Sequence, residues 1–172
     1  MKGARTITFI VLVAAQVVIC NFVNTGPRLV LSVLPSLILA LSIRYSAIRT
    51  MATALLVGLA VDFFTTGVLG LSAIPLVAVA FCREWLTRLV FGSDVYARQE
   101  EISERKQGAA KLLIGLLLAN ILYFIIFVWI EAAGTRPFAF CALRAALSSL
   151  AGTVAGFFAL RLLNSVEDAR WK

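Results

Sequence analysis

Asp62 is the residue whose type and surroundings point most directly to chemistry. It lies near the end of an otherwise apolar run, residues 50–64, in which a carboxylate is costly unless it turns inward, reaches the interface or accepts hydrogen bonds. One role for such an acid is to bind a ligand or to relay a proton. The alternative, which we favour, is that Asp62 stabilises a turn by accepting hydrogen bonds from the N–H groups of Thr65, Thr66 or the start of the next helix.

Three glycines surround this acid. Gly58 lies four residues before Asp62 and shares its helix face, where a glycine lets a neighbouring helix approach closely. Gly67 and Gly70 follow Asp62 in a break between apolar runs, which favours a turn. The segment therefore predicts a helix, a glycine-rich turn and a second helix, with Asp62 close to the turn.

Other arrangements of catalytic residues are missing from the sequence. The chain has no His, which removes the commonest metal ligand and the base of a His-containing triad. Cys20, Cys82 and Cys141 form no Cys-x-x-Cys pair, so we expect small buried side chains rather than a metal site or a disulfide framework. No phosphate loop, serine nucleophile motif or carboxylate pair is present. We predict a protein that is not an enzyme and has no cofactor.

The composition indicates the kind of protein that must hold these residues in place. Of the 172 residues 61% are hydrophobic, far more than one soluble domain buries, so we infer that lipid is the solvent of this chain. A net charge of +7 would suit nucleic acid in a soluble protein. Here the aromatic residues lie mostly within apolar runs and not among Arg and Lys, so we expect no nucleic-acid partner.

Apolar runs broken by charges or turn residues predict one transmembrane domain, residues 1–172. A helix needs about 20 residues, or about 17 at the short end, to cross the hydrocarbon core, and the second to fourth runs reach this length only with flanking residues. The predicted fold class is an all-α membrane protein, a compact bundle of about six transmembrane helices, with five spans as the alternative. The six runs are residues 6–23, 29–43, 50–64, 69–82, 112–130 and 138–163.

The distribution of Lys and Arg predicts the orientation of these spans. With the N-terminus in the cytoplasm, all 16 Lys and Arg except Arg28, Arg136 and Arg144 fall on the inner side, Arg83 among them. This bias favours an even number of spans with both termini in the cytoplasm. The polar stretch 92–111 then becomes a cytoplasmic connector, either a surface helix or a solvated loop.

A stripe of small residues marks the last apolar run. Ser148, Gly152 and Gly156 recur every four residues, so they line one face of a helix and let another helix pack closely. The stripe predicts a packing seam, either inside the chain's own bundle or against another protein. Three polar side chains within the apolar runs are expected to hydrogen-bond between helices: Gln16, Asn21 and Asn120.

Three segments in this order carry a family resemblance: residues 34–41, the basic corner 44–49, and the pattern Gly58-x-x-x-Asp62 followed by Gly70-Leu-Ser-Ala. Together with the short chain, the basic connector and the late apolar helices, they resemble MreD, the rod shape-determining membrane protein of bacteria. The order of features covers most of the chain. Pro35 fits the pattern, whereas Ser36 departs from it, because many members carry an acidic or amide residue there.

The resemblance implies a non-enzymatic component of the elongation machinery in the bacterial cytoplasmic (inner) membrane. Its partners would be MreC, the MreB cytoskeleton, a peptidoglycan synthase and transpeptidase pair, and membrane lipid. The residues singled out above then have structural or interaction roles: Pro35, Gly58, Asp62, Gly67, Gly70, Gly152 and Gly156.

The family is also similar in architecture to the substrate-binding subunits of energy-coupling-factor vitamin transporters. The alternative function is therefore a substrate-binding membrane subunit of a vitamin or small-molecule transporter. Such a subunit needs a pocket on which polar and aromatic side chains converge. The predicted outer half offers few of them: Asp62, Asn21, Asn24 and Arg136.

Overall fold

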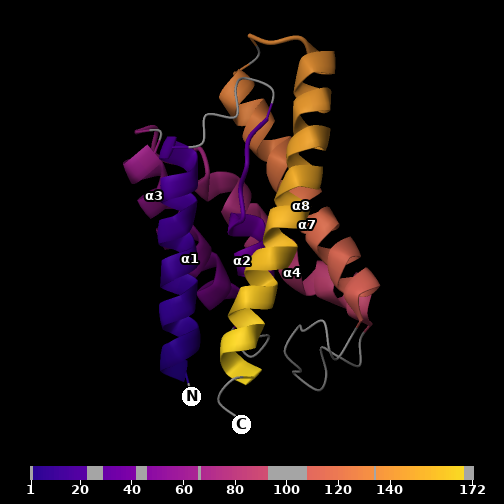
Figure 1. The fold of residues 1–172 in the computed structure, drawn as a ribbon. Coiled ribbons are helices and arrows are strands. Elements are labelled where there is room, and N and C mark those ends of the chain that lie inside the picture. The colour runs from indigo at the N-terminus through magenta and orange to yellow at the C-terminus, as the bar shows by residue number, and fades with distance from the viewer. Residues whose placement is uncertain are drawn as a thin grey trace.

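Helices form all of the regular secondary structure in the residues that the computed structural model describes, which are 2–22, 29–41, 46–65, 67–92, 108–133 and 135–168. In Figure 1 α1 stands upright while α7 and α8 slant in opposite directions, and the start of α1 and the end of α8 lie at the same end of the bundle. The helices are α1 (Lys2–Phe22), α2 (Leu34–Ala40), α3 (Ala47–Thr65), α4 (Ala73–Phe91), α7 (Ala109–Ala132) and α8 (Phe138–Asp168).

Three of these helices are long and apolar enough to cross a membrane: α3, α7 and the part of α8 over Phe138–Leu163. In α1 the apolar part, Thr6–Phe22, is shorter. Many large apolar side chains point outward, and Phe81 of α4 is 68% exposed while Phe158 of α8 is 58% exposed. Length, composition and the apolar exterior are those of a helical membrane protein.

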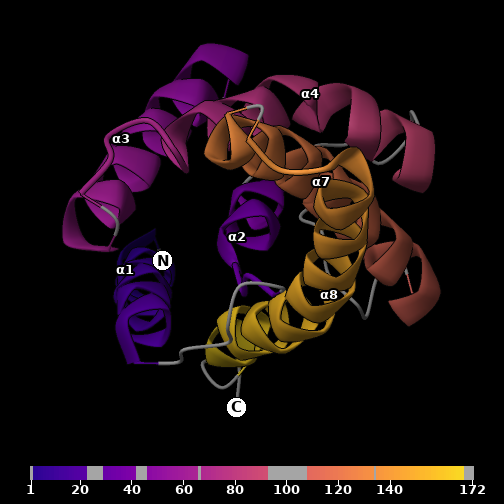
Figure 2. The same ribbon diagram turned by 90° about the horizontal axis from the view of Figure 1, so that it is seen from above.

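The short helix α2 lies at the centre of the bundle. Figure 2 shows α1, α3, α4, α7 and α8 arranged around it. All seven of its residues are buried, and it contacts α4, α7 and α8. Around it α3 packs on α4, α4 on α7, and α7 on α8. The core of the protein is therefore organised about a helix that has no face left for lipid.

The prediction of a helical second span over residues 29–43 is wrong. Residues 29–33 form no helix, and α2 has seven residues, which at a rise of about 1.5 Å each cover about 10 Å. Non-helical backbone at membrane depth is stable only where protein buries it or where it lines a cavity. Pro35 stands in the first turn of α2, where its missing N–H breaks no helical hydrogen bond.

Arg83 also lies elsewhere than predicted. It was assigned to a cytoplasmic loop because residue 82 was expected to end a span, but α4 continues to Phe91 and Arg83 is only 6% exposed. Its guanidinium donates hydrogen bonds to the carbonyl oxygens of Leu39 and Leu41. These bonds, and the positive charge, stabilise the C-terminal end of the central helix.

The connector predicted at residues 92–111 is described only at its two ends. Gly92 ends α4 with a φ of 89°, and α7 begins at Ala109. Residues 93–107, where a surface helix and a solvated loop were the alternatives, lie outside the described residues. At the far end of the chain α8 extends beyond the predicted limit at residue 163, to Asp168.

Candidate functional site

Asp62 joins the end of α3 to the start of α4. Its side chain is completely buried. The carboxylate accepts hydrogen bonds from the N–H groups of Gly70 at 2.9 Å, Ser72 at 2.9 Å and Ala73 at 3.3 Å. Ser72 is the N-cap residue of α4 and makes no capping bond with its own side chain. Asp62 therefore supplies, from the preceding helix, the acceptor and the negative charge that a helix N-terminus needs.

Thr65 and Thr66 were the other two residues whose N–H groups were proposed as donors to Asp62. Thr65 is the last residue of α3, and its hydroxyl donates to the Val61 carbonyl oxygen at 2.7 Å. Thr66 lies outside the described residues. Gly67 donates its N–H to the backbone oxygen of Asp62 at 2.9 Å. The backbone of Asp62 thus holds the first part of the turn, and its side chain holds the last part.

The glycines near Asp62 serve the same turn in two ways. Gly67 and Gly70 have φ values of 67° and 101°, a region that residues with a Cβ rarely adopt. Gly58 is needed for space, because a Cβ there would lie 2.4 Å from the Cα of Ala73. The close crossing at Gly58 brings the first residue of α4 beside α3, one helical turn from the carboxylate that binds its N–H group.

Gln16 holds the non-helical stretch in front of α2. It is 1% exposed, its Nε2 donates to the Leu31 carbonyl oxygen at 3.0 Å, and its Oε1 accepts from the Val33 N–H at 2.8 Å. From the other side, Ser148 of α8 accepts a hydrogen bond from the Val30 N–H at 2.9 Å. Side chains of two flanking helices thus satisfy backbone groups that no helix satisfies.

Gln16→Leu is expected to destabilise the fold by about 2–5 kcal/mol, because it leaves one buried donor and one buried acceptor unpaired. We would measure the fraction of protein that remains monodisperse in detergent after heating. Val18→Leu on the same helix, where the side chain is 54% exposed, is the matched control and should match the wild type. Equal heat resistance of Gln16→Leu would show that the amide is not needed.

The other two amides predicted to hydrogen-bond between helices do so. Asn21 donates to the Phe64 carbonyl oxygen at 3.2 Å and joins α1 to α3. Asn120 of α7 donates to the Ser36 hydroxyl of α2 at 3.3 Å. Position 36, where the sequence departs from the family pattern, therefore keeps a polar side chain that is used inside the core.

The small-residue stripe of α8 packs inside the chain's own bundle. A Cβ on Gly156 would lie 1.9 Å from the Ser36 hydroxyl oxygen. A Cβ on Gly152 would lie 2.8 Å from Oδ1 of Asn120 and 3.0 Å from the Ser32 carbonyl oxygen. The sequence left open whether this stripe packs against another protein or inside the bundle. The structure shows that Gly152 and Gly156 pack inside the bundle.

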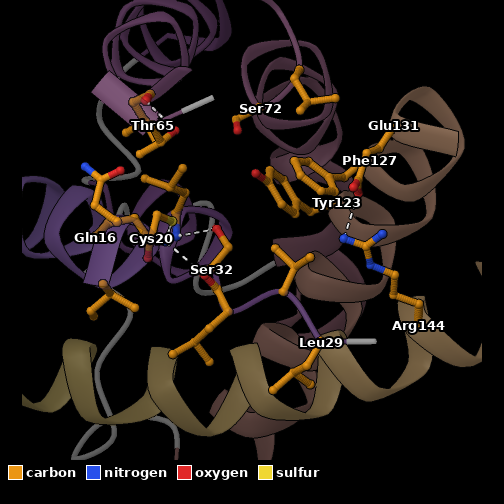
Figure 3. A pocket seen from close by; sticks show the side chains of 17 residues that line it. Gln16, Cys20, Leu29, Ser32, Thr65, Ser72, Tyr123, Phe127, Glu131 and Arg144 are labelled. Carbon is orange, nitrogen blue, oxygen red and sulfur yellow. Dashed lines mark hydrogen bonds and ion pairs between the residues drawn. The ribbon is translucent and has the colours of Figure 1, made fainter. Parts of the chain in front are cut away.

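A cavity of about 430 Å³ opens between the end of α1, the stretch before α2, the α3–α4 turn and helices α7 and α8. Tyr123 is buried in its wall, and the side chains of Ser72 and Ser32 also line the cavity. The Phe127 ring stacks on Tyr123 with the ring centroids 5.7 Å apart. Figure 3 shows Gln16 and Cys20 on the side of the cavity opposite Arg144.

Of the four polar residues that the sequence offers in the outer half, one lies in the cavity wall. Asn21 lines the cavity, but Asp62 and Arg136 do not, and Asn24 lies outside the described residues. The carboxylate of Asp62 is turned to backbone N–H groups, and the Arg136 guanidinium carbon lies 5.4 Å from the ring centroid of Phe140.

Arg144 and Glu131 form the charged part of the cavity wall. The Nη2 of Arg144 lies 2.9 Å from Oε2 of Glu131, and the arginine side chain is only 8% exposed. The sequence predicted that Arg144 lies on the outer side, within the run 138–163. Its position four residues before Ser148 continues the stripe of Gly152 and Gly156, and this spacing is the signal that could have placed it inside.

The cysteines are free thiols with unequal exposure: Cys141 is buried as predicted, Cys82 is partly exposed and Cys20 is exposed, against the prediction. Among the described residues, no group of three or more His, Cys, Asp or Glu side chains is placed to hold a metal ion. We compared the chain with protein-family models, with curated proteins and with solved structures, and none of them matches it.

Proposed function

We propose that this chain is a non-enzymatic integral membrane component of the bacterial cell-shape machinery. In this role it scaffolds peptidoglycan synthesis together with MreC, the MreB cytoskeleton and a synthase and transpeptidase pair. The proposal rests on the resemblance of residues 34–41 and of the Gly58–Asp62–Gly70 pattern to MreD.

The observation that supports a scaffold most is the use made of Asp62. Asp62 is the residue that the sequence marks as most suited to a chemical role. It is fully buried, and its carboxylate accepts hydrogen bonds from backbone N–H groups at the start of α4. A catalytic or transporting carboxylate must instead reach a substrate, an ion or a water path. Rigid turns and close helix crossings favour a protein that presents fixed surfaces.

The test is photo-crosslinking in intact bacterial membranes. A crosslinking residue at Trp85, which is 65% exposed on α4, should capture proteins of the elongation machinery. The same residue at Leu86, which is 4% exposed on the same helix, is the control and should capture none of them. Recovery of paired ATPases with a coupling subunit at Trp85, and of no elongation protein, would contradict the scaffold and support a transporter.

A transporter subunit is the second candidate because of the cavity. Its volume of about 430 Å³ lies within the usual range for small-molecule sites, roughly 300–1,000 Å³. Aromatic, hydroxyl and charged side chains meet in its wall, among them Tyr123, Ser72 and Arg144. The crosslinking experiment distinguishes the two candidates by the proteins that it recovers.

We further propose that the chain crosses the inner membrane six times, with residues 29–40 as the second crossing and both termini in the cytoplasm. The common end of the first and last helices supports an even number of crossings (Figure 1). Arg83 and Arg144 are buried in helices, so neither counts toward the charge of a loop. Twelve Lys and Arg then remain on the cytoplasmic side and two on the outer side.

A reporter that is active only outside the cytoplasm should give no signal when it is fused to Lys172. The same reporter inserted at Thr135, between α7 and α8, should give a strong signal, because that turn lies at the opposite end of the bundle in this topology. Enzyme activity of the two fusions in whole cells is the measurement. A strong signal at Lys172 would exclude the six-crossing topology.

A further inference from the structure

The cavity contains a hydrogen-bond donor that the protein does not use. Nε of Arg144 is buried and has no hydrogen-bond partner among the described residues. A buried guanidinium N–H without an acceptor is costly, and such groups in native proteins normally meet a ligand or a water molecule. Arg144 belongs to the cavity lining, so a turn of its side chain toward the cavity would bring this N–H to an acceptor bound there.

The surroundings of Arg144 restrict what this acceptor is. Glu131 neutralises part of the arginine charge, because its Oε2 lies 2.9 Å from Nη2. The rest of the nearby wall is mainly apolar, with Leu29, Val30 and Phe127. An arginine in such surroundings binds the oxygens of a phosphate or carboxylate strongly, because the bond is charge-assisted and little water competes.

We propose that this cavity binds the acidic headgroup of an amphipathic molecule, with a phosphate or carboxylate oxygen on Arg144 and an apolar part along the aliphatic wall. The ligand is either a membrane lipid whose headgroup enters the cavity or a smaller acid that enters whole. The site is independent of the scaffold proposal, because it lies inside the chain and involves no partner protein.

Cys20 gives direct access to the occupancy of this cavity. It belongs to the cavity lining and is exposed, so a thiol reagent can reach it when the cavity is empty. Figure 3 places it across the cavity from Arg144, where the apolar part of a bound molecule would lie. A ligand held by Arg144 should therefore slow the reaction of Cys20.

The experiment uses the full chain in nanodiscs of zwitterionic phosphatidylcholine and follows maleimide addition to Cys20 by mass spectrometry. Decyl phosphate should slow the reaction saturably, by about fivefold or more once the site is filled. Decanol has the same chain without the acid and should not. Arg144→Lys keeps the charge but removes the planar fork, and should raise the half-saturating concentration about tenfold.

A second variant keeps the test decisive if Arg144→Lys does not fold. Glu131→Gln removes the carboxylate that competes for the guanidinium, so this variant should bind decyl phosphate more tightly than the wild type. A folding defect would weaken binding and cannot explain such a gain. Arg88→Lys is the matched control. Arg88 pairs with Glu84 at 2.5 Å, but this exposed pair is not part of the cavity, and its loss should change nothing.

Two further probes distinguish the sources of the acid. Protection by inorganic phosphate alone supports a small free acid, whereas protection that requires phosphatidylglycerol in the nanodisc supports a lipid headgroup. The proposal is overturned if decanol protects as well as decyl phosphate, or if Arg144→Lys responds like the wild type. It is also overturned if no probe slows the reaction, because water then satisfies Arg144.

Discussion

Asp62→Leu is expected to prevent assembly of the bundle. The carboxylate now accepts hydrogen bonds from the N–H groups of Gly70, Ser72 and Ala73 inside the protein. Leucine accepts none, and each buried donor left unpaired costs about 1–3 kcal/mol. A total of about 3 kcal/mol or more is a large share of a stability of roughly 5–15 kcal/mol. Size-exclusion chromatography in detergent should show aggregated or degraded protein in place of the wild-type peak.

Asp62→Asn is the matched control for this prediction. An amide oxygen in the position of Oδ2 keeps acceptor contacts with Gly70, Ser72 and Ala73, which lie 2.9–3.3 Å from that atom. The variant should therefore fold and retain most activity in a cell-shape complementation assay. If it inserts and folds normally but fails to complement, the charge itself is required, and a ligand or proton-relay role for Asp62 becomes the better interpretation.

Replacing Gly152 and Gly156 together with Leu is expected to cause misassembly. At Gly156 even one added carbon would lie 1.9 Å from the Ser36 hydroxyl oxygen and 2.6 Å from the Ser36 Cβ, so α8 must move away from α2. At Gly152 an added carbon meets Oδ1 of Asn120 and a backbone oxygen. Overpacking alone costs about 1–3 kcal/mol per site, and here it also breaks the buried contacts around α2.

Two variants test whether the contact with α2 is the cause. Val154→Leu on the same helix faces outward, at 58% exposed, and should assemble like the wild type. Gly156→Ala should destabilise the protein, and adding Ser36→Gly should restore part of the loss because it removes both clashing atoms. Normal assembly of the double leucine variant would contradict the packing seam.

The sequence by itself determined the features that repeat along a helix or lie within one turn. The four-residue spacing of Gly152 and Gly156 predicted a close-packed face, and α8 has that face. Asp62 followed by Gly67 and Gly70 predicted a turn fixed by a carboxylate, and the start of α4 supplies N–H groups to it. Such features are local, so residue type and spacing suffice to recognise them.

Only the tertiary structure decided which apolar runs face lipid and which face protein. Hydropathy measures transfer out of water, and both destinations are apolar, so residues 29–43 looked like a lipid-facing helix although α2 is short and buried on all sides. For the same reason Arg83 was counted on the inner side and Arg144 on the outer side of the membrane. Their partners, the end of α2 and Glu131, stand on other helices.

The cavity depended on the tertiary structure most of all. Its wall brings together Gln16, Ser72, Tyr123 and Arg144, which come from distant parts of the chain. No spacing along the sequence encodes that meeting, because it results from five helices packing around a sixth. The segments of this fold follow from short-range periodicity, whereas its centre and its cavity follow from long-range packing and from buried polar groups that must find partners.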